Sequence, residues 1–151
     1  MIDRLKDEQK SLSSLEEIVD EFDFLNDPYD QLNYLIDLGL DLPKIDSSLK
    51  TEQYLIHGCQ NNVWLDVEFY DEPAVMLIKA ESEAKIVNGI VAVLMAIFNG
   101  KTAQQGLDFN VREAFDRLGL DKLIGSQRKN GLNGMVQKIR EAARWQLAQD
   151  A

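Results

Sequence analysis

The only cysteine and the only histidine of the chain lie two residues apart, in a polar segment between two apolar runs. This segment, residues 57–62, is called the Cys59 loop below. A thiolate is a strong nucleophile, so Cys59 is the first candidate for covalent chemistry. A lone cysteine is more often an inert buried residue. The position of Cys59 in a Gly-Cys-Gln turn, rather than inside an apolar strand or helix, favours the chemical role.

Activation of the thiol is the next question, because an unperturbed cysteine with a pKa of about 8.5 is mostly protonated at neutral pH. His57 is near in sequence, and a Cys–His pair is a common way to activate a thiol. Side chains two apart share a face only in an extended segment, and a turn at Gly58 would break that alignment. His57 is therefore either a base for Cys59 or a solvated histidine at a strand end.

Metal and cofactor sites find little support in the sequence. One cysteine forms no internal disulfide and builds no cysteine-rich zinc or iron–sulfur site without a second chain. The segment from Gly131 to Gly134 lacks both the Lys-Ser/Thr of a P-loop and the spacing of a dinucleotide-binding turn. We therefore expect no bound metal and no cofactor. Composition and spacing alone favour a carrier or adaptor that presents one loop thiol.

Length and charge limit the class of protein. The chain has 151 residues, a natural length for one domain, and 26 acidic against 16 basic residues. This balance disfavours nucleic acid and anionic lipid, which both require a positive face. The longest apolar run, residues 90–98, is too short to span a bilayer, and residues 1–8 lack a signal-peptide core. A single thiol suits a reducing compartment, so we expect a cytoplasmic protein.

The sequence before the cysteine predicts two helices. Ser14 and Glu17 form a capping box, after which apolar residues recur at helical spacing. A proline in the first turn opens the second helix at Asp27-Pro28, and Gly39 is expected to end it. Residues 40–51 read as a connection, and residues 1–13 as a frayed end.

Three strands are expected next, because the apolar pattern changes to a period of two. Residues 53–56 predict a strand that runs into the Cys59 loop. Residues 63–70 alternate between apolar and polar side chains, and residues 75–80 follow after a turn. Three strands in succession form an antiparallel meander.

A central helix is predicted after the strands, with Ser82 as its cap and Gly100 as its end. Apolar residues cover nearly its whole circumference, which is typical of a helix enclosed by other elements. Gly89 within it is unfavourable by about 1 kcal/mol relative to alanine. We therefore expect another backbone to approach closely at Gly89.

The remaining sequence predicts further helices. Thr102 and Asn110 each begin one, Gly119 ends the second, and residues 120–129 read as irregular before a last helix. Helices, then strands, then helices imply an α+β fold. We expect a single domain over residues 1–151, with a three-stranded antiparallel meander packed against helices from both ends of the chain.

Four segments, in the same order and spacing, carry the patterns of one known family. Residues 58–64 match its Gly-Cys-x-Ser-x-Val-Trp signature, and residues 38–43 its Leu-Gly…Leu-Pro pattern. Residues 81–90 match a Ser-Asp-Ala-x-Ile-Val-Lys-Gly-Leu segment, and residues 128–132 an Arg-Ser-Asn-Gly-Leu segment. In these features the chain resembles the SufE/CsdE family of sulfur-acceptor proteins.

The chain departs from the family pattern at four places. Asn61 stands where the family usually has serine, Glu83 where it has aspartate, and Asn88 where it has a basic residue. Residues 126–127 replace part of a Ser-Pro-Ser run. These departures bear on the choice of partner more than on the chemistry, because the cysteine and the arginine of the motifs remain.

The resemblance implies a fold similar to that of IscU-type scaffolds and a role in sulfur transfer. Such proteins take a persulfide sulfur from a pyridoxal-phosphate-dependent cysteine desulfurase of the SufS/CsdA kind, and they stimulate that enzyme. They pass the sulfur towards iron–sulfur cluster assembly on a SufB-like scaffold. Cys59 would be the persulfide carrier, and Arg128 would hold the loop or favour the thiolate, unless it is a surface or capping arginine.

Several residues near the thiol are expected to take part in binding: His57, Gly58, Gln60 and Trp64. Gly58 supplies the backbone freedom for the loop to swing out at a partner's surface. A persulfide must be hidden from water and stray thiols, so the resting Cys59 should be partly covered. Val63 and Trp64 are candidates for that cover, with plain core packing as the alternative.

Two other functions stay open. The first is a non-catalytic adaptor that regulates a desulfurase by docking, with the cysteine incidental. The second is an iron–sulfur scaffold, which is disfavoured because such a scaffold needs several thiolates. The expected partners are a desulfurase and a downstream scaffold, without nucleic acid or membrane, and the chain is expected to be a monomer or a weak homodimer.

Overall fold

The computed structural model describes residues 12–150, which form helices and a small sheet. The strands are β1 (Val63–Tyr70) and β2 (Val75–Ser82), and two short 3-10 turns are η1 (Ser47–Leu49) and η2 (Glu52–Tyr54). The helices are α2 (Leu15–Leu25), α3 (Pro28–Leu40), α4 (Lys85–Phe98), α5 (Ala103–Asp108), α6 (Val111–Leu118), α7 (Leu120–Ile124) and α8 (Ser126–Asp150). The expected α+β class is confirmed.

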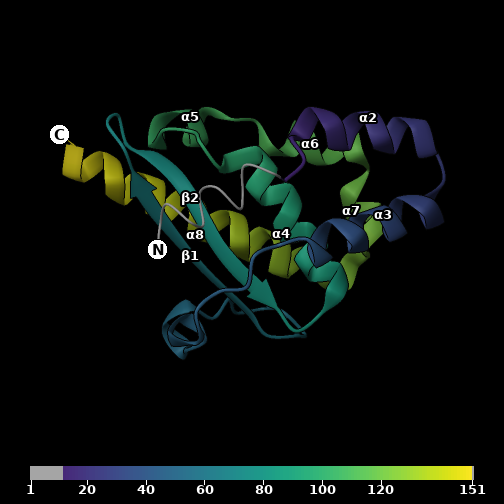
Figure 1. The fold of residues 1–151 in the computed structure, drawn as a ribbon, viewed down its shortest axis with the longest axis horizontal. Coiled ribbons are helices and arrows are strands. Elements are labelled where there is room, and N and C mark those ends of the chain that lie inside the picture. The colour runs from purple at the N-terminus through teal and green to yellow at the C-terminus, as the bar shows by residue number, and fades with distance from the viewer. Residues whose placement is uncertain (1–11, 151) are drawn as a thin grey trace.

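Helix α4 occupies the centre of the molecule (Figure 1). Ten of its fourteen residues are buried, as the all-round apolar pattern predicts. It packs against β2 on one side and against α2 and α3 on another, while α8 packs against β1, α5 and α7. Residues of the Cys59 loop, α4 and α8 line a common cavity. No helix within residues 12–150 is both long and apolar enough to cross a membrane.

Within residues 12–150 the sheet has two strands rather than the three of the expected meander. Strands β1 and β2 pair antiparallel, from Val63 opposite Ser82 to Tyr70 opposite Val75. The strand predicted over residues 53–56 is wrong, because Tyr54 and Leu55 donate their N–H groups back to residues 51 and 52 in a 3-10 turn. What remains of a third strand is an isolated bridge between Leu55 and Trp64.

Two helix boundaries differ from those predicted. Gly39 does not end α3 but lies buried inside it, and the helix continues to Leu40. Ser82 is not the N-cap of α4, because that position is occupied by Ala84. The Ser82 hydroxyl still accepts a hydrogen bond from the Ala84 N–H at 3.1 Å, so it stabilises the turn that leads into the helix.

The region predicted to be irregular, residues 120–129, is helical. Helix α7 is only five residues long, too short for periodicity to identify, and it buries Leu120 and Ile124. The frayed end expected over residues 1–13 falls mostly outside the described residues, but Leu12 packs against the core. The caps predicted at Ser14, Thr102 and Asn110 are confirmed, each side chain accepting a hydrogen bond from a backbone N–H three residues on.

Helices α3 and α4 cross with their backbones in contact, at Gly39 and Gly89. A Cβ atom on Gly89 would lie 2.8 Å from the carbonyl carbon of Leu35 and closer still to its oxygen. A Cβ atom on Gly39 would lie 2.6 Å from the Gly89 nitrogen. The close approach expected at Gly89 is confirmed, and Gly39 is its counterpart rather than a helix stop.

Substitution of Gly89 by alanine should destabilise the fold. The new methyl group meets backbone atoms that cannot rotate away, so we expect the free energy of unfolding to fall by about 2–3 kcal/mol, as in other overpacked cores. Urea denaturation measures this change. The matched control is Gly134→Ala in α8, where the nearest atom is a methyl carbon of the Ile56 side chain, Cγ2, at 3.2 Å. That variant should stay within about 1 kcal/mol of the parent chain; equal effects of both variants would contradict the proposed crossing.

Candidate functional site

The Cys59 side chain points from its loop towards the N-terminal half of α8. The residue is half-buried, whereas its neighbours Gly58 and Gln60 are exposed. The closest approach is to Gly131, where a Cβ atom would lie 2.5 Å from the Cys59 Sγ atom. Gly58 has a φ of 89°, in the left-handed region that favours glycine, and this turn directs the next residue back towards the helix.

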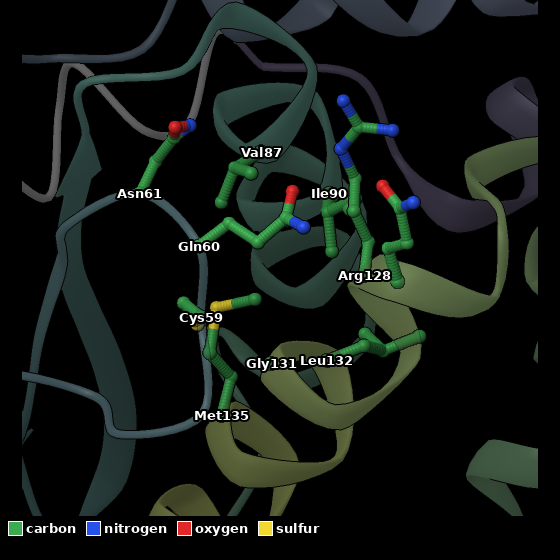
Figure 2. A pocket seen from close by; sticks show the side chains of 10 residues that line it. Cys59, Gln60, Asn61, Val87, Ile90, Arg128, Gly131, Leu132 and Met135 are labelled. Atoms are coloured by element: carbon green, nitrogen blue, oxygen red, sulfur yellow. The ribbon is translucent and has the colours of Figure 1, made fainter.

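A cavity of about 20 Å³, called the thiol cavity below, lies beside the cysteine (Figure 2). Ten residues line it: Cys59, Gln60, Asn61, Val87, Ile90, Gln127, Arg128, Gly131, Leu132 and Met135. The side chains from α4 and the deeper ones from α8 are apolar and buried, while the loop and the first turn of α8 provide an exposed polar rim. This volume holds about one water-sized group.

Burial raises the pKa of the Cys59 thiol above its ordinary value. An apolar environment disfavours the charged thiolate, and no charged side chain among the described residues offsets this rise. The thiol in this arrangement is therefore protonated and shielded near neutral pH.

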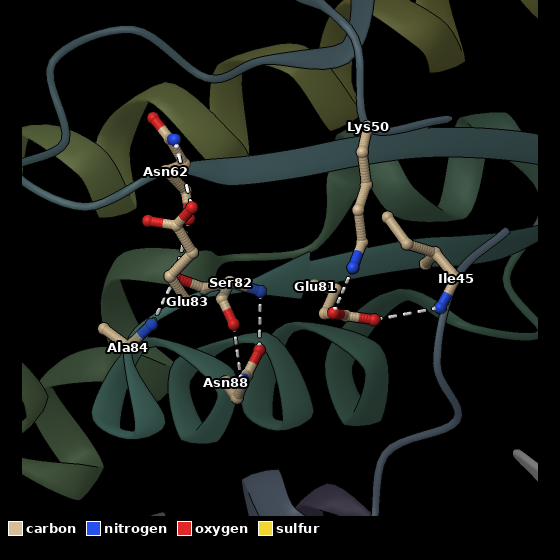
Figure 3. A network of polar contacts seen from close by, with 8 residues as sticks. All are labelled: Ile45, Lys50, Asn62, Glu81, Ser82, Glu83, Ala84 and Asn88. Atoms are coloured by element: carbon tan, nitrogen blue, oxygen red, sulfur yellow. Dashed lines mark hydrogen bonds and ion pairs between the residues drawn. The ribbon is translucent and has the colours of Figure 1, made fainter. Parts of the chain in front are cut away.

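The C-terminal end of the Cys59 loop is fixed at Asn62 (Figure 3). The Asn62 carbonyl oxygen accepts hydrogen bonds from the Ser82 hydroxyl at 2.9 Å and from the Glu83 N–H at 3.2 Å. The Asn62 side-chain amide donates to the Glu83 carboxylate at 3.2 Å. These contacts join the loop to the corner between β2 and α4.

That corner is itself closed by Asn88. Its side-chain oxygen accepts from the Ser82 N–H at 2.8 Å, and its side-chain amide donates to the Ser82 carbonyl at 3.0 Å. Nearby, the Glu81 carboxylate accepts from Lys50 at 2.8 Å and from the Ile45 N–H at 3.1 Å. Asn88 stands where the family pattern has a basic residue, and its side chain forms hydrogen bonds to the Ser82 backbone within the chain.

The N-terminal end of the loop is fixed next to β1 and α8. The Ile56 N–H donates to the Val63 carbonyl at 2.8 Å. A Cβ atom on Gly134 would lie 3.4 Å from the His57 carbonyl oxygen, so the loop backbone rests on this part of the helix. The five residues between Ile56 and Asn62 are therefore held at both ends.

Of the residues singled out in the sequence, Cys59, Gln60 and Arg128 lie together at the thiol cavity. Arg128 lines the rim of the thiol cavity, but its Nη1 group donates to the Ile124 carbonyl at 3.0 Å. Figure 2 shows its guanidinium group pointing away from the Cys59 sulfur. In this arrangement Arg128 is a capping arginine at the C-terminal end of α7.

His57 and Trp64 do not line the thiol cavity. The His57 side chain is 77% exposed, and its Nε2 atom lies 3.6 Å from a Glu52 carboxylate oxygen. Trp64 lies on β1 with the Lys50 ammonium group 5.7 Å from its ring centroid. Val63 is fully buried in the main core and does not line the cavity either. The alternative of plain core packing therefore holds for Val63.

The apolar cover of the thiol comes from residues that sequence reasoning did not assign to the site. They are Val87 and Ile90 of α4, and Gly131, Leu132 and Met135 of α8. A signal for them exists, because two glycines three residues apart inside a helix leave space on one face for another segment. Within residues 12–150, no three His, Cys, Asp or Glu side chains are grouped to hold a metal ion.

The thiol should react slowly in the folded chain. We expect iodoacetamide to modify native Cys59 at least about tenfold more slowly than the urea-unfolded chain near neutral pH, because the thiol is half-buried and its pKa is raised. The difference should narrow as the pH rises through the folded-state pKa, where the native thiolate forms. Time courses by intact-protein mass spectrometry measure both rates, and equal rates near neutral pH would contradict the shielded arrangement.

Comparisons with known proteins identify the family of this chain. The model of the SufE family, described as the Fe-S metabolism associated domain, matches residues 16–143. An uncharacterized SufE-like protein of Rhizobium etli is 37% identical over 145 residues, which cover 95% of this chain and 98% of the relative. An uncharacterized SufE-like protein of Rhizobium meliloti is 35% identical over 138 residues, 90% of this chain and 99% of the relative. The chain therefore belongs to the SufE family of proteins associated with Fe–S metabolism.

Proposed function

We propose that this chain accepts a persulfide sulfur on Cys59 from a pyridoxal-phosphate-dependent cysteine desulfurase, stimulates that enzyme, and passes the sulfur on to iron–sulfur cluster assembly. One observation carries the proposal: the only thiol of the chain lies on a loop, against a small apolar cavity. Family membership supports it through the association with Fe–S metabolism. The pyridoxal phosphate belongs to the partner enzyme.

The transfer is a thiol exchange. The Cys59 thiolate attacks the outer sulfur of the donor's persulfide and forms a new sulfur–sulfur bond. The bond between the two donor sulfurs breaks, and its electron pair leaves with the inner sulfur as the donor's thiolate. Cys59 then carries the persulfide and its proton. The outer sulfur passes from one thiolate to the other without a change in its oxidation state, so the step needs no oxidant and no reductant.

The thiol cavity suits storage of the transferred sulfur. Its volume of about 20 Å³ accommodates roughly one added atom of sulfur size, as it would a single water. Its deep walls are the buried apolar side chains of Val87, Ile90, Leu132 and Met135. An outer sulfur placed there is kept from water and from other thiols, which would otherwise remove it by exchange.

Reaction requires the Cys59 loop to leave this arrangement. Burial keeps the thiol neutral, and the attacking species is the thiolate. Movement of the loop away from α8 into a partner's site removes the burial and lowers the pKa towards its ordinary value. Gly58 permits the backbone change, and the exposed Gln60 and Arg128 on the rim would contact the partner.

The proposal places this chain in the cytoplasm, where a reducing environment keeps a single thiol free. Its partners there are the desulfurase and the scaffold that receives the sulfur.

The test is intact-protein mass spectrometry after incubation with a cysteine desulfurase, pyridoxal phosphate and free cysteine. We expect a gain of one sulfur atom that a reductant removes, and a complete loss of that gain in Cys59→Ser. Circular dichroism of Cys59→Ser checks that it folds, and a reaction without cysteine is the blank.

Desulfurase turnover measured in the same samples separates sulfur transfer from docking. If Cys59→Ser stimulates the enzyme as well as the parent chain does, and neither gains sulfur, the chain is an adaptor and the acceptor role is wrong. A sulfur gain that survives in Cys59→Ser would place the acceptor atom elsewhere.

A further inference from the structure

The face of α8 that receives the Cys59 loop carries two glycines, Gly131 and Gly134. A Cβ atom on Gly134 would lie 3.2 Å from the Ile56 Cγ2 atom and 3.4 Å from the His57 carbonyl oxygen. The three atoms nearest to a Cβ atom on Gly131 would instead all belong to Cys59, with Sγ at 2.5 Å, Cβ at 3.5 Å and Cα at 3.7 Å. Both glycines support the loop, but only Gly131 contacts the sulfur.

The distances at Gly131 show what a side chain there would displace. The Cβ and Cα atoms of Cys59 lie at ordinary van der Waals distances from the hypothetical methyl group, so the loop backbone has no need to move. The Sγ atom lies far inside contact distance and must move. It sits at the end of a single rotatable bond, and rotation about that bond carries it to another staggered position.

We propose that Gly131 is the positioning residue for the sulfur of Cys59: its missing side chain forms the notch that holds the sulfur inward, against the thiol cavity. A methyl group in the notch turns the sulfur outward without unfolding the loop or the helix. Gly131 thereby sets the balance between a shielded thiol and a reactive one. The significance for sulfur transfer rests on the proposed function, whereas the notch itself is a property of the isolated chain.

Helix propensity makes the inference testable. Glycine in a helix interior is less stable than alanine, so alanine at either position should favour α8. A residue with a purely structural role would show reactivity and stability changing together, since a less stable chain exposes its thiol more often. The notch predicts the opposite combination at Gly131: a more reactive thiol in a chain that is no less stable.

The experiment compares the variants Gly131→Ala and Gly134→Ala with the parent chain, without any partner. The rate of Cys59 modification by iodoacetamide is followed by intact-protein mass spectrometry, and stability by urea denaturation. We expect Gly131→Ala to react at least about tenfold faster, with an unchanged or higher denaturation midpoint. Gly134→Ala should stay within about twofold of the parent rate. An unchanged rate in Gly131→Ala, or an equal increase in Gly134→Ala, overturns the proposal.

A double-mutant cycle covers the case in which Gly131→Ala lowers stability. The change Gly131→Ala is measured in the parent chain and again in a Cys59→Ala background, where no sulfur is present to clash. If the notch exists for the sulfur, Gly131→Ala is more favourable in the second background than in the first. The same effect in both backgrounds means that the methyl group clashes with something else, and the proposal is wrong.

The consequence for sulfur transfer is measured separately, on chains already loaded by a desulfurase. Loaded Gly131→Ala should lose its sulfur to added dithiothreitol faster than the loaded parent chain, because the outer sulfur is no longer held in the thiol cavity. Equal rates of loss would overturn the role of the notch in sulfur protection. If neither the parent chain nor the variant takes up sulfur, the proposed function fails. The alkylation rates and the double-mutant cycle still test whether Gly131 positions the sulfur of Cys59.

Discussion

The enclosure of α4 is the constraint on which the rest of this structure depends. A helix that is apolar on almost every side must be covered on almost every side, and it is covered here by β2, α2 and α3. The contact with α3 is a backbone contact at Gly39 and Gly89, which leaves little freedom in the crossing. Val87 and Ile90, which line the thiol cavity, are fixed by the same packing.

The site combines a firm frame with a weakly held loop. Hydrogen bonds to Ser82 and Glu83 fix the loop at Asn62, and the Ile56 N–H fixes its other end. Between these points, Cys59 is held by van der Waals contact with α8. Such contacts are individually small, which agrees with the proposed movement of the loop away from α8. Shielding and release of one thiol are thus compatible with a rigid core.

The features predicted correctly from the sequence were mainly local ones, together with the close backbone approach at Gly89, whereas the partners in long-range contacts were not predictable. The caps at Ser14 and Thr102 depend on residues three apart, and the enclosure of α4 follows from its own composition. Residues 53–56 have a strand-like composition, but the N–H groups of Tyr54 and Leu55 donate within a 3-10 turn, which the apolar periodicity does not reveal. In the site, the sequence identified Cys59 and its loop, while its partners on α4 and α8 depend on packing between distant segments.

The fixed ends of the Cys59 loop limit how far the Cys59 thiol can move away from the rest of the chain. Cys59 is three residues from each fixed end, at Ile56 and Asn62, so a fully extended chain carries its Cα atom no further than about 10 Å from either. The thiol cannot enter a deep tunnel on its own tether. For the proposed transfer, a donor whose sulfur lies deeper than that has to bring it outward on a mobile segment of its own, and the two chains then share the distance that the sulfur travels.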